Sequence, residues 1–186
     1  GGGGAGGLWG GDRRNSMEVA MLTDEEIAAL LALPKTVTST RKREREQKKS
    51  IRVNYPVESE CGSAQFELYS RQNQIDPDAY SCGLIYQHPS GERVTLVRYN
   101  GSNHQHRNPL EGNELISFKC HIHRATSRYI EMGDKAEKFA ETTDRYQNLD
   151  GALHCLVLDC NISGLHTSAP DDTAITSQMN LLDDQR

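Results

Sequence analysis

The sequence predicts an α+β protein: a short N-terminal helix, an antiparallel twisted sheet of about five strands, and C-terminal helices packed on one face. Three observations predict this class. A helical apolar stripe follows Thr23, short segments of alternating polarity fill residues 51–123, and helical spacing returns after Arg124. Alternating segments joined by turn-length links are typical of antiparallel sheets, and helices that follow them in the chain can cover the apolar face.

Length and charge fit one domain of this kind. The chain has 186 residues and a formal net charge of -5, which allows one real core and argues against a surface that binds nucleic acid everywhere. Residues 1–20 are rich in glycine and polar residues, and residues 166–186 carry aspartates without an apolar pattern. We therefore expect a single globular domain at 21–165, between a disordered glycine-rich extension and a disordered acidic tail.

Cysteine usage and hydropathy indicate the compartment. Five cysteines form an odd set without a Cys-x-x-Cys pair. The first residues do not resemble a signal peptide, and no apolar run approaches the roughly 18 residues that span a bilayer. These features predict free thiols, a cytoplasmic location and no membrane contact. No glycine-rich nucleotide-binding motif appears, and we expect no cofactor.

Residues 23–34 predict the N-terminal helix. Thr23 and Glu26 form a capping box, in which each side chain binds the backbone N–H of the other residue. Apolar residues at positions 27, 30, 31 and 33 give a helical stripe, and Pro34 ends it. We expect a short amphipathic helix that docks on the rest of the domain.

Residues 41–52 form a basic segment with seven cations and two anions, a local net charge of +5. One interpretation is a phosphate-binding arm. The other is a solvated helix or linker face on which Glu44 and Lys48 pair across one turn. The sequence leaves both open.

Alternation of apolar and polar residues predicts the strands. They cover residues 51–57, 65–72, 80–87, 92–100 and 114–123. His88–Gly91 is a hairpin turn between two of them. The segments 73–78 and 100–113 are polar and contain glycine or proline, so we expect loops there.

Two helices follow the predicted sheet. Residues 125–132 predict a short helix that ends at Gly133. Residues 144–160 predict a longer one with an apolar stripe, interrupted by Gly151, which costs about 1 kcal/mol inside a helix.

The last predicted strand carries the main candidate site. Its apolar residues occupy one face, so Lys119, His121 and His123 must occupy the other. That face is wet or lines a cleft, because buried donors of this kind would all need partners. Arg124 and Arg128 follow where the strand leads into a helix.

Histidines and arginines together predict chemistry on a phosphate. A histidine exchanges protons near neutral pH, and arginines hold anions. Such a set suffices for metal-independent RNA cleavage. The alternative to a functional site is a polar sheet face whose histidines and lysine are simply solvated. We expect catalysis from His104, His121 and His123, and phosphate binding from Arg98, Lys119, Arg124 and Arg128.

The loop 100–113 is a second candidate, because its His104, His106 and Arg107 cluster at one point of a polar loop. We expect His106 and Arg107 to contribute from there. If residues 93–100 pair with 114–123 as one long hairpin, however, the loop lies about 20 Å from His123, at roughly 3.3 Å per residue. Only a curled sheet or a loop that folds back brings the two halves together.

Two His-x-His pairs also suggest a metal site, because imidazoles two residues apart on a strand point to the same side. No aspartate or glutamate adjoins either pair, and Cys120 points to the opposite face. We expect no bound metal.

Several segments resemble an uncharacterised family of small bacterial domains of unknown function. They are Met21–Lys35, Cys82–Tyr86, Leu96–Gly101 and Cys120–Thr126. The resemblance covers about residues 21–165. It implies the domain limits but no activity.

The strand end Arg98, Tyr99 and Asn100, followed by a loop with His104 and His106, is also similar to the TumE-like toxins of the barnase/RelE-like ribonuclease superfamily. This resemblance implies a toxin-type ribonuclease, RNA as substrate and a cognate antitoxin protein as partner. His121 and His123 lie in a different local context from that family's second histidine cluster. We therefore expect a metal-independent endoribonuclease. The alternative is a non-catalytic module that binds nucleic acid or protein.

Overall fold

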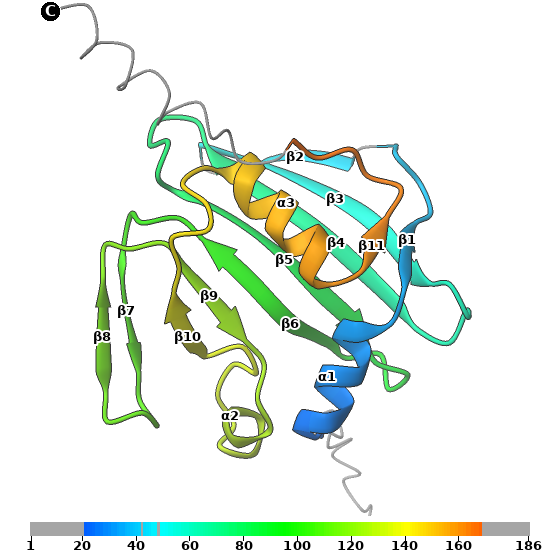
Figure 1. Cartoon of the computed structure of the whole chain (residues 1–186), viewed down its shortest axis with the longest axis horizontal. Coiled ribbons are helices and arrows are strands. Elements are labelled where there is room, and N and C mark those ends of the chain that lie inside the picture. Colours follow the sequence, from blue (N-terminus) through cyan, green and yellow to red (C-terminus); the bar gives the residue numbers. More distant parts are fainter. Residues whose placement is uncertain (1–20, 42, 48, 169–186) are drawn as a thin grey trace, which may run out of the picture.

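A computed structural model of the chain describes residues 21–41, 43–47 and 49–168. The predicted extension at 1–20 and most of the predicted tail at 166–186 lie outside these residues. The described part has the predicted α+β class, with more strands than expected (Figure 1). The helices are α1 (Asp24–Ala32), α2 (Ser127–Glu131) and α3 (Leu149–Asp159).

A nine-stranded sheet forms the body of the domain, in the order β10-β9-β6-β5-β4-β3-β1-β11, and β2 pairs with β3. A separate hairpin consists of β7 and β8. The strands are β1 (Lys35–Val37), β2 (Arg43–Gln47), β3 (Ser50–Ser59), β4 (Gln65–Asn73), β5 (Tyr80–Gln87), β6 (Arg93–Asn100), β7 (Gln105–Asn108), β8 (Glu114–Ser117), β9 (His121–Arg124), β10 (Phe139–Thr142) and β11 (Ile162–Ser163).

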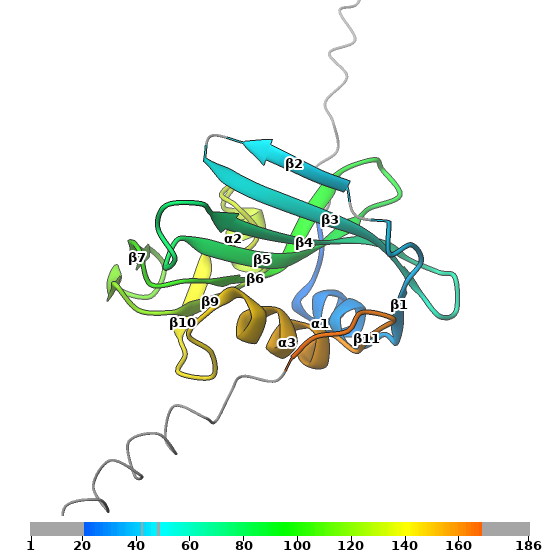
Figure 2. The ribbon, with the colours of Figure 1, turned by 90° about the horizontal axis from the view of Figure 1, so that it is seen from above.

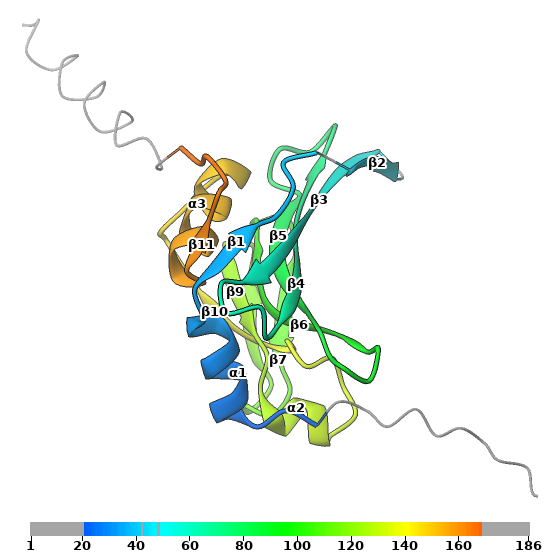
Figure 3. The same cartoon turned by 90° about the vertical axis from the view of Figure 1, so that its right-hand side faces the viewer.

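The strands β3 to β6 form the antiparallel centre that the alternation predicts. Leu68, Leu84 and Val97 lie opposite one another on one face and are fully buried. This face packs against α3, where Leu156 is also fully buried. Figures 2 and 3 show α1 and α3 on that same side of the sheet. We call the opposite side the open face.

The N-terminal helix begins as predicted. The Thr23 hydroxyl accepts from the Glu26 N–H at 3.1 Å, and the Glu26 carboxylate accepts from the Thr23 N–H at 2.9 Å. Beyond the helix, Lys35 is completely buried, and its ammonium donates to the carbonyls of Leu31, Leu33 and Cys160. One lysine thereby joins the ends of α1 and α3.

The predicted strand at 114–123 is wrong. The extended conformation is interrupted at Phe118, which has a φ of +48° and is 62% exposed. The first half, β8, pairs with β7, whereas the second half, β9, lies between β6 and β10. Alternation continued through the break because the residues on both sides are apolar at every second position, so it gave no sign of the change of sheet.

Other boundaries also shift. The basic segment contains strand β2, so the interpretation that made it a helix or linker has the wrong secondary structure. The long predicted helix begins only at Leu149, where the Asn148 side chain accepts from the Gly151 N–H at 2.8 Å. Gly151 is thus part of the capped first turn. The short helix before Gly133 is confirmed as α2. In the part of the chain that is described, no helix combines the length and apolarity that a membrane crossing requires.

Candidate functional site

Two rows of side chains cross the open face at right angles to the strands. Residues directly opposite in an antiparallel sheet point to the same side. The first row consists of Tyr69, Gly83, Arg98 and His123, and the second of Arg71, Ser81, Asn100 and His121. Register alone therefore places Arg98 of β6 directly opposite His123 of β9, and Arg71 of β4 in the same row as His121.

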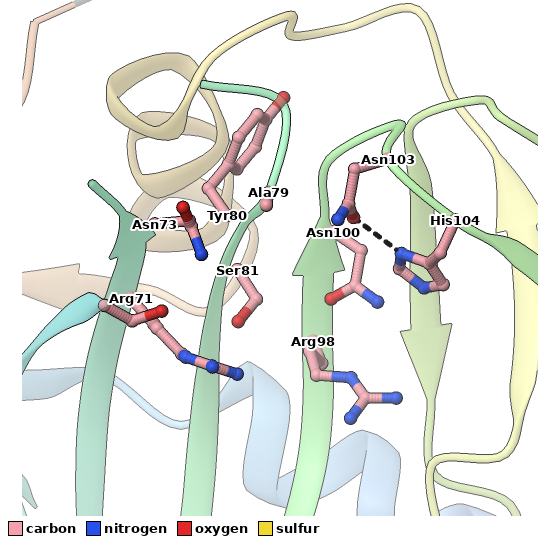
Figure 4. Close-up of a pocket in the computed structure, with 10 residues that line it drawn as sticks. Arg71, Asn73, Ala79, Tyr80, Ser81, Arg98, Asn100, Asn103 and His104 are labelled. Atoms are coloured by element: carbon pink, nitrogen blue, oxygen red, sulfur yellow. Dashed lines mark hydrogen bonds between the residues drawn. The ribbon is translucent and has the colours of Figure 1, made fainter. Parts of the chain in front are cut away.

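A pocket of about 410 Å³ opens over these rows. Four strands supply its floor, and the loop after β6 supplies one wall. Figure 4 shows Arg71, Arg98, Asn100 and His104 around it. The remaining lining residues are Ser50, Asn73, Ala79, Tyr80, Ser81 and Asn103. Most of them are polar, which suits a charged ligand better than an apolar one.

The loop that carries His104 depends on Gly101. A Cβ at this position would lie 2.1 Å from the Asp78 carbonyl oxygen, so no other residue fits without a backbone shift. The Gly101 N–H donates to the Tyr80 carbonyl at 3.0 Å, which holds the loop against β5. From this anchor the chain turns so that Asn103 and His104 face the pocket (Figure 4).

The hairpin of β7 and β8 folds back toward β10. Asn108, which is fully buried, donates to the Ala140 carbonyl at 2.7 Å and accepts from the Ala140 N–H at 2.9 Å. Its side-chain oxygen also lies 3.0 Å from Nε2 of His106. One asparagine therefore fixes both the hairpin and the imidazole that the hairpin carries.

These elements bring four imidazoles together. The ring centroids of His104 and His121 are 5.0 Å apart, those of His106 and His123 4.6 Å, and those of His121 and His123 4.9 Å. The long-hairpin geometry, which separated the two halves by about 20 Å, is wrong. The break before β9 and the folded-back hairpin close that gap.

The hydrogen bonds of the two strand histidines assign their neutral tautomers. Nδ1 of His121 lies 2.7 Å from the Lys119 carbonyl oxygen, and Nδ1 of His123 lies 3.0 Å from the Glu137 carbonyl oxygen. A carbonyl only accepts, so each Nδ1 carries the hydrogen. Each Nε2 then keeps its lone pair and is directed away from these carbonyls.

The cluster is electrically neutral near pH 7. Burial, with Arg98 and the other imidazoles adding repulsion, lowers the pKa of His121 to about 4 and that of His123 to about 2. Burial also lowers the pKa of His104, which is exposed, and of His106, which is half-buried. These histidines are therefore neutral near pH 7, and the cluster holds no imidazolium cation.

Three buried polar atoms at this place have no hydrogen-bond partner among the described residues. They are Nε of Arg98, Oδ1 of Asn100 and Nε2 of His123. The Arg98 guanidinium has one ionic neighbour, the Glu137 carboxylate at 3.6 Å. Buried polar atoms without a hydrogen-bond partner are rare in proteins, and a bound water, an ion or a functional role can account for them. Here a donor and two acceptors lie in adjacent rows of the open face.

The structure brings together five of the predicted site residues: Arg98 and the four histidines. His121 and His123 of β9, which were expected to be catalytic, are shielded from solvent, with exposed fractions of 0% and 1%. His104 is exposed and lines the pocket. Among the predicted catalytic residues, only His104 can touch a substrate directly.

The other four predicted residues lie outside both this group and the lining of the pocket. Lys119 is exposed in the connection between β8 and β9, and Arg107 binds the Asn113 carbonyl within the hairpin. Arg124 points away from the open face and lies 3.9 Å from Glu141, and Arg128 of α2 pairs with Glu111. Strand alternation explains the correction for Arg124, since it follows His123.

Sequence reasoning missed Arg71 and Ser81 as pocket residues. Both lie at open-face positions of predicted strands, but only the cross-strand register places Ser81 opposite Asn100 and Arg71 opposite Ser81. Tyr99, which the toxin resemblance grouped with the site, lies on the other face, where its hydroxyl donates to Asp159 at 2.5 Å. Within the described ranges, no group of three or more His, Cys, Asp or Glu side chains is placed so that it could hold a metal ion.

Comparisons with known proteins identify a family and no activity. Searches of curated proteins and of solved structures gave no match. They lend no support to the resemblance to TumE-like toxins, so the activity that it implied stays a prediction. Residues 22–162 match the model of a family of unknown function, DUF6978. The predicted resemblance to an uncharacterised family is therefore confirmed, and the chain belongs to this family of unknown function.

Proposed function

We propose that this protein binds RNA in the pocket of the open face and cleaves it without a metal ion. One observation carries the proposal: an exposed imidazole, His104, and two arginines, Arg71 and Arg98, line the same pocket. The guanidinium groups would bind a phosphodiester, and the imidazole would lie next to the ribose.

The chemistry needs only groups of this chain. Nδ1 of His104 lies 2.9 Å from the Asn103 side-chain oxygen, so Nε2 carries the free lone pair when the amide oxygen accepts. His104 takes the proton of the 2′-hydroxyl, whose oxygen attacks the adjacent phosphorus. The bond to the 5′-oxygen breaks, that oxygen receives a proton from the imidazolium, and a 2′,3′-cyclic phosphate remains. Arg71 and Arg98 stabilise the charge that develops on the phosphoryl oxygens.

His121 and His123 are positioning residues in this scheme. They are buried behind His104, with their Nδ1 atoms tied to backbone carbonyls. The ring of His121 packs against that of His104 and limits its movement. Replacing either residue would disturb the placement of His104 and would not remove a group that contacts RNA.

A non-catalytic RNA-binding module is the second candidate. The observation that favours it is the burial of His121 and His123, which leaves His104 as the exposed imidazole at the pocket. Efficient ribonucleases divide proton removal and donation between two groups. A binding module needs only the arginines and the pocket. The antitoxin partner implied by the toxin resemblance remains a proposal of the same kind.

The test is incubation of the purified protein with single-stranded RNA in the presence of EDTA. Cleavage should give 2′,3′-cyclic phosphate ends, detected by mass spectrometry, and should fail on an oligonucleotide that is 2′-deoxy throughout. His104→Gln should lower the rate at least about 100-fold, the usual contribution of a general base. His166→Gln, an exposed histidine beyond β11, is the matched control. Binding without cleavage by the wild type would favour the second candidate, and equal rates in both variants would exclude His104 as the base.

A further inference from the structure

The second row of the open face continues beyond the pocket. Arg45 of β2 lies opposite Arg52 of β3, and Arg52 lies opposite Arg71 of β4. All three side chains therefore point to the side that holds the pocket. The row from β2 to β6 crosses four strand spacings, about 19 Å at roughly 4.8 Å each.

We propose that a single strand of RNA runs along this arginine row, so that the nucleotides beyond the scissile phosphate lie over β3 and β2. This inference rests on RNA as the ligand of the pocket. It adds the direction of the strand, across the sheet toward β2, and the residues that bind its outer phosphates.

Like charges directly opposite each other in a sheet are destabilising. Arg52 is partly compensated, since its Nε donates to Asn54 at 2.9 Å and its guanidinium lies 3.7 Å from Glu67. No ion pair of Arg45 or Arg71 exists among the described residues. The acidic neighbours on β2 do not help: Glu44 and Glu46 lie opposite Val53 and Ile51 and point to the other face. A polyanion along the row removes this repulsion.

The row is also prepared for binding. The Arg52 guanidinium lies over the Tyr69 ring, 4.2 Å from its centroid, which restricts the side chain before a ligand arrives. Tyr69 is itself held on Gly83, where an added Cβ would lie 2.7 Å from the ring. Preorganised guanidinium groups lose less entropy when they bind phosphate.

This placement favours the interpretation of the basic segment as a phosphate-binding arm. Its charge is not a uniform solvated face, because β2 alternates Arg45 toward the open face with glutamates toward the other. An unpaired strand is the fitting ligand, since in-line attack by a 2′-hydroxyl requires a flexible backbone and an A-form duplex displays its phosphates on a rigid cylinder. Single-strand channels of other proteins likewise combine a cationic groove with sequence tolerance.

The experiment compares two uncleavable 2′-O-methyl RNA ligands, a dinucleotide and a single strand of about twelve nucleotides, by fluorescence anisotropy at several salt concentrations. Arg45→Gln should reduce the preference for the longer ligand several-fold and lower the salt slope by about 1, the effect of one lost phosphate contact. Arg124→Gln removes the same charge from the other face and is the matched control.

The outcomes separate this inference from the proposed function. If Arg98→Gln weakens binding of both ligands while Arg45→Gln binds them no differently from the control Arg124→Gln, the pocket binds RNA but the row does not. Tighter binding of a duplex than of the single strand would also overturn the row. If the wild type binds neither ligand, the pocket proposal and this inference both fail. Circular dichroism of each variant establishes that it is folded.

Discussion

The imidazole rings of His104 and His121 lie 5.0 Å apart and edge to face, although one belongs to a loop and the other to a strand of the main sheet. The contact joins the solvent-exposed side of the site to its buried interior. His104 meets the pocket, whereas His121 is covered completely. Because the inner imidazoles stay neutral, the interior adds no positive charge against the one that His104 gains when it accepts a proton.

The buried histidines should make the protein sensitive to acid. In the unfolded chain a histidine has a pKa near 6.5, whereas in the folded state the pKa is about 4 for His121 and about 2 for His123. Below pH 6.5 the unfolded chain therefore binds protons that the folded chain does not, and stability falls. Between pH 7 and pH 5 each histidine should cost about 2 kcal/mol of unfolding free energy.

Urea unfolding at the two pH values measures this loss. His123→Gln should be less stable at pH 7 but should show a smaller difference between pH 7 and pH 5, because one of the two titrating groups is absent. A wild-type free energy that does not change over this interval would show that the two imidazoles are not buried neutral groups.

Asn108 should control the position of the hairpin. Asn108→Ala leaves the Ala140 N–H and carbonyl without partners in a buried place and frees His106. At about 1 to 2 kcal/mol for each of the two buried bonds to Ala140, the unfolding free energy should fall by about 2 to 4 kcal/mol. Gln105→Ala removes an exposed bond to Ser117 in the same hairpin and should cost less than about 0.5 kcal/mol. Equal losses in chemical denaturation would contradict the anchoring role.

Local rules predicted the central fold well. The capping box of α1, the turn at His88–Gly91 and the strands β3 to β6 follow from neighbouring residues, and all are present. The short strands β1, β10 and β11 were missed, because two to four residues carry too little periodicity and are strands only through their partners. The interruption of the strand at Phe118 depends on one positive φ. Sequence does not predict it, because a positive φ is uncommon for residues other than glycine.

The sequence predicted which residues form the histidine cluster better than it predicted their burial and their neighbours. The abundance of histidine between positions 104 and 123 pointed to the cluster, and strand alternation placed His121 and His123 together correctly. Burial could not be foreseen, because it depends on the preceding hairpin folding back so that His106 packs against both rings, which local alternation does not predict. Arg71 was missed because only the register of β4, β5 and β6 places it in one row with Ser81 and Asn100.

Lys35 should be essential for stability. Lys35→Met keeps most of the apolar stem but leaves the carbonyls of Leu31, Leu33 and Cys160 without their donor. Loss of a buried charged donor with three partners should lower the unfolding free energy by about 3 kcal/mol. Lys119→Met, at an exposed position, is the matched control and should have little effect on thermal denaturation. Similar melting temperatures for the two variants would argue against this bridge between α1 and α3.

The decrease of kcat/KM for RNA cleavage at low pH should report the pKa of His104. Burial lowers the pKa of this imidazole, and Arg98 and His106 lower it further. Its neutral form should therefore persist below pH 6.5, so that kcat/KM stays at its plateau until the pH falls under that value. The ring signals of His104 in an NMR titration without RNA give the same pKa independently of activity.

Two arginine variants separate electrostatics from binding at this histidine. Arg98→Gln removes a positive charge that lowers the pKa of His104 and should move the His104 titration toward 6.5. Arg71→Gln removes a cation of the same pocket that is not among those causes, so it should weaken RNA binding and leave the titration in place. If both variants shift the titration equally, the field at His104 comes from the whole cationic face. If neither does, burial alone keeps the imidazole neutral, and the base would work without help from Arg98.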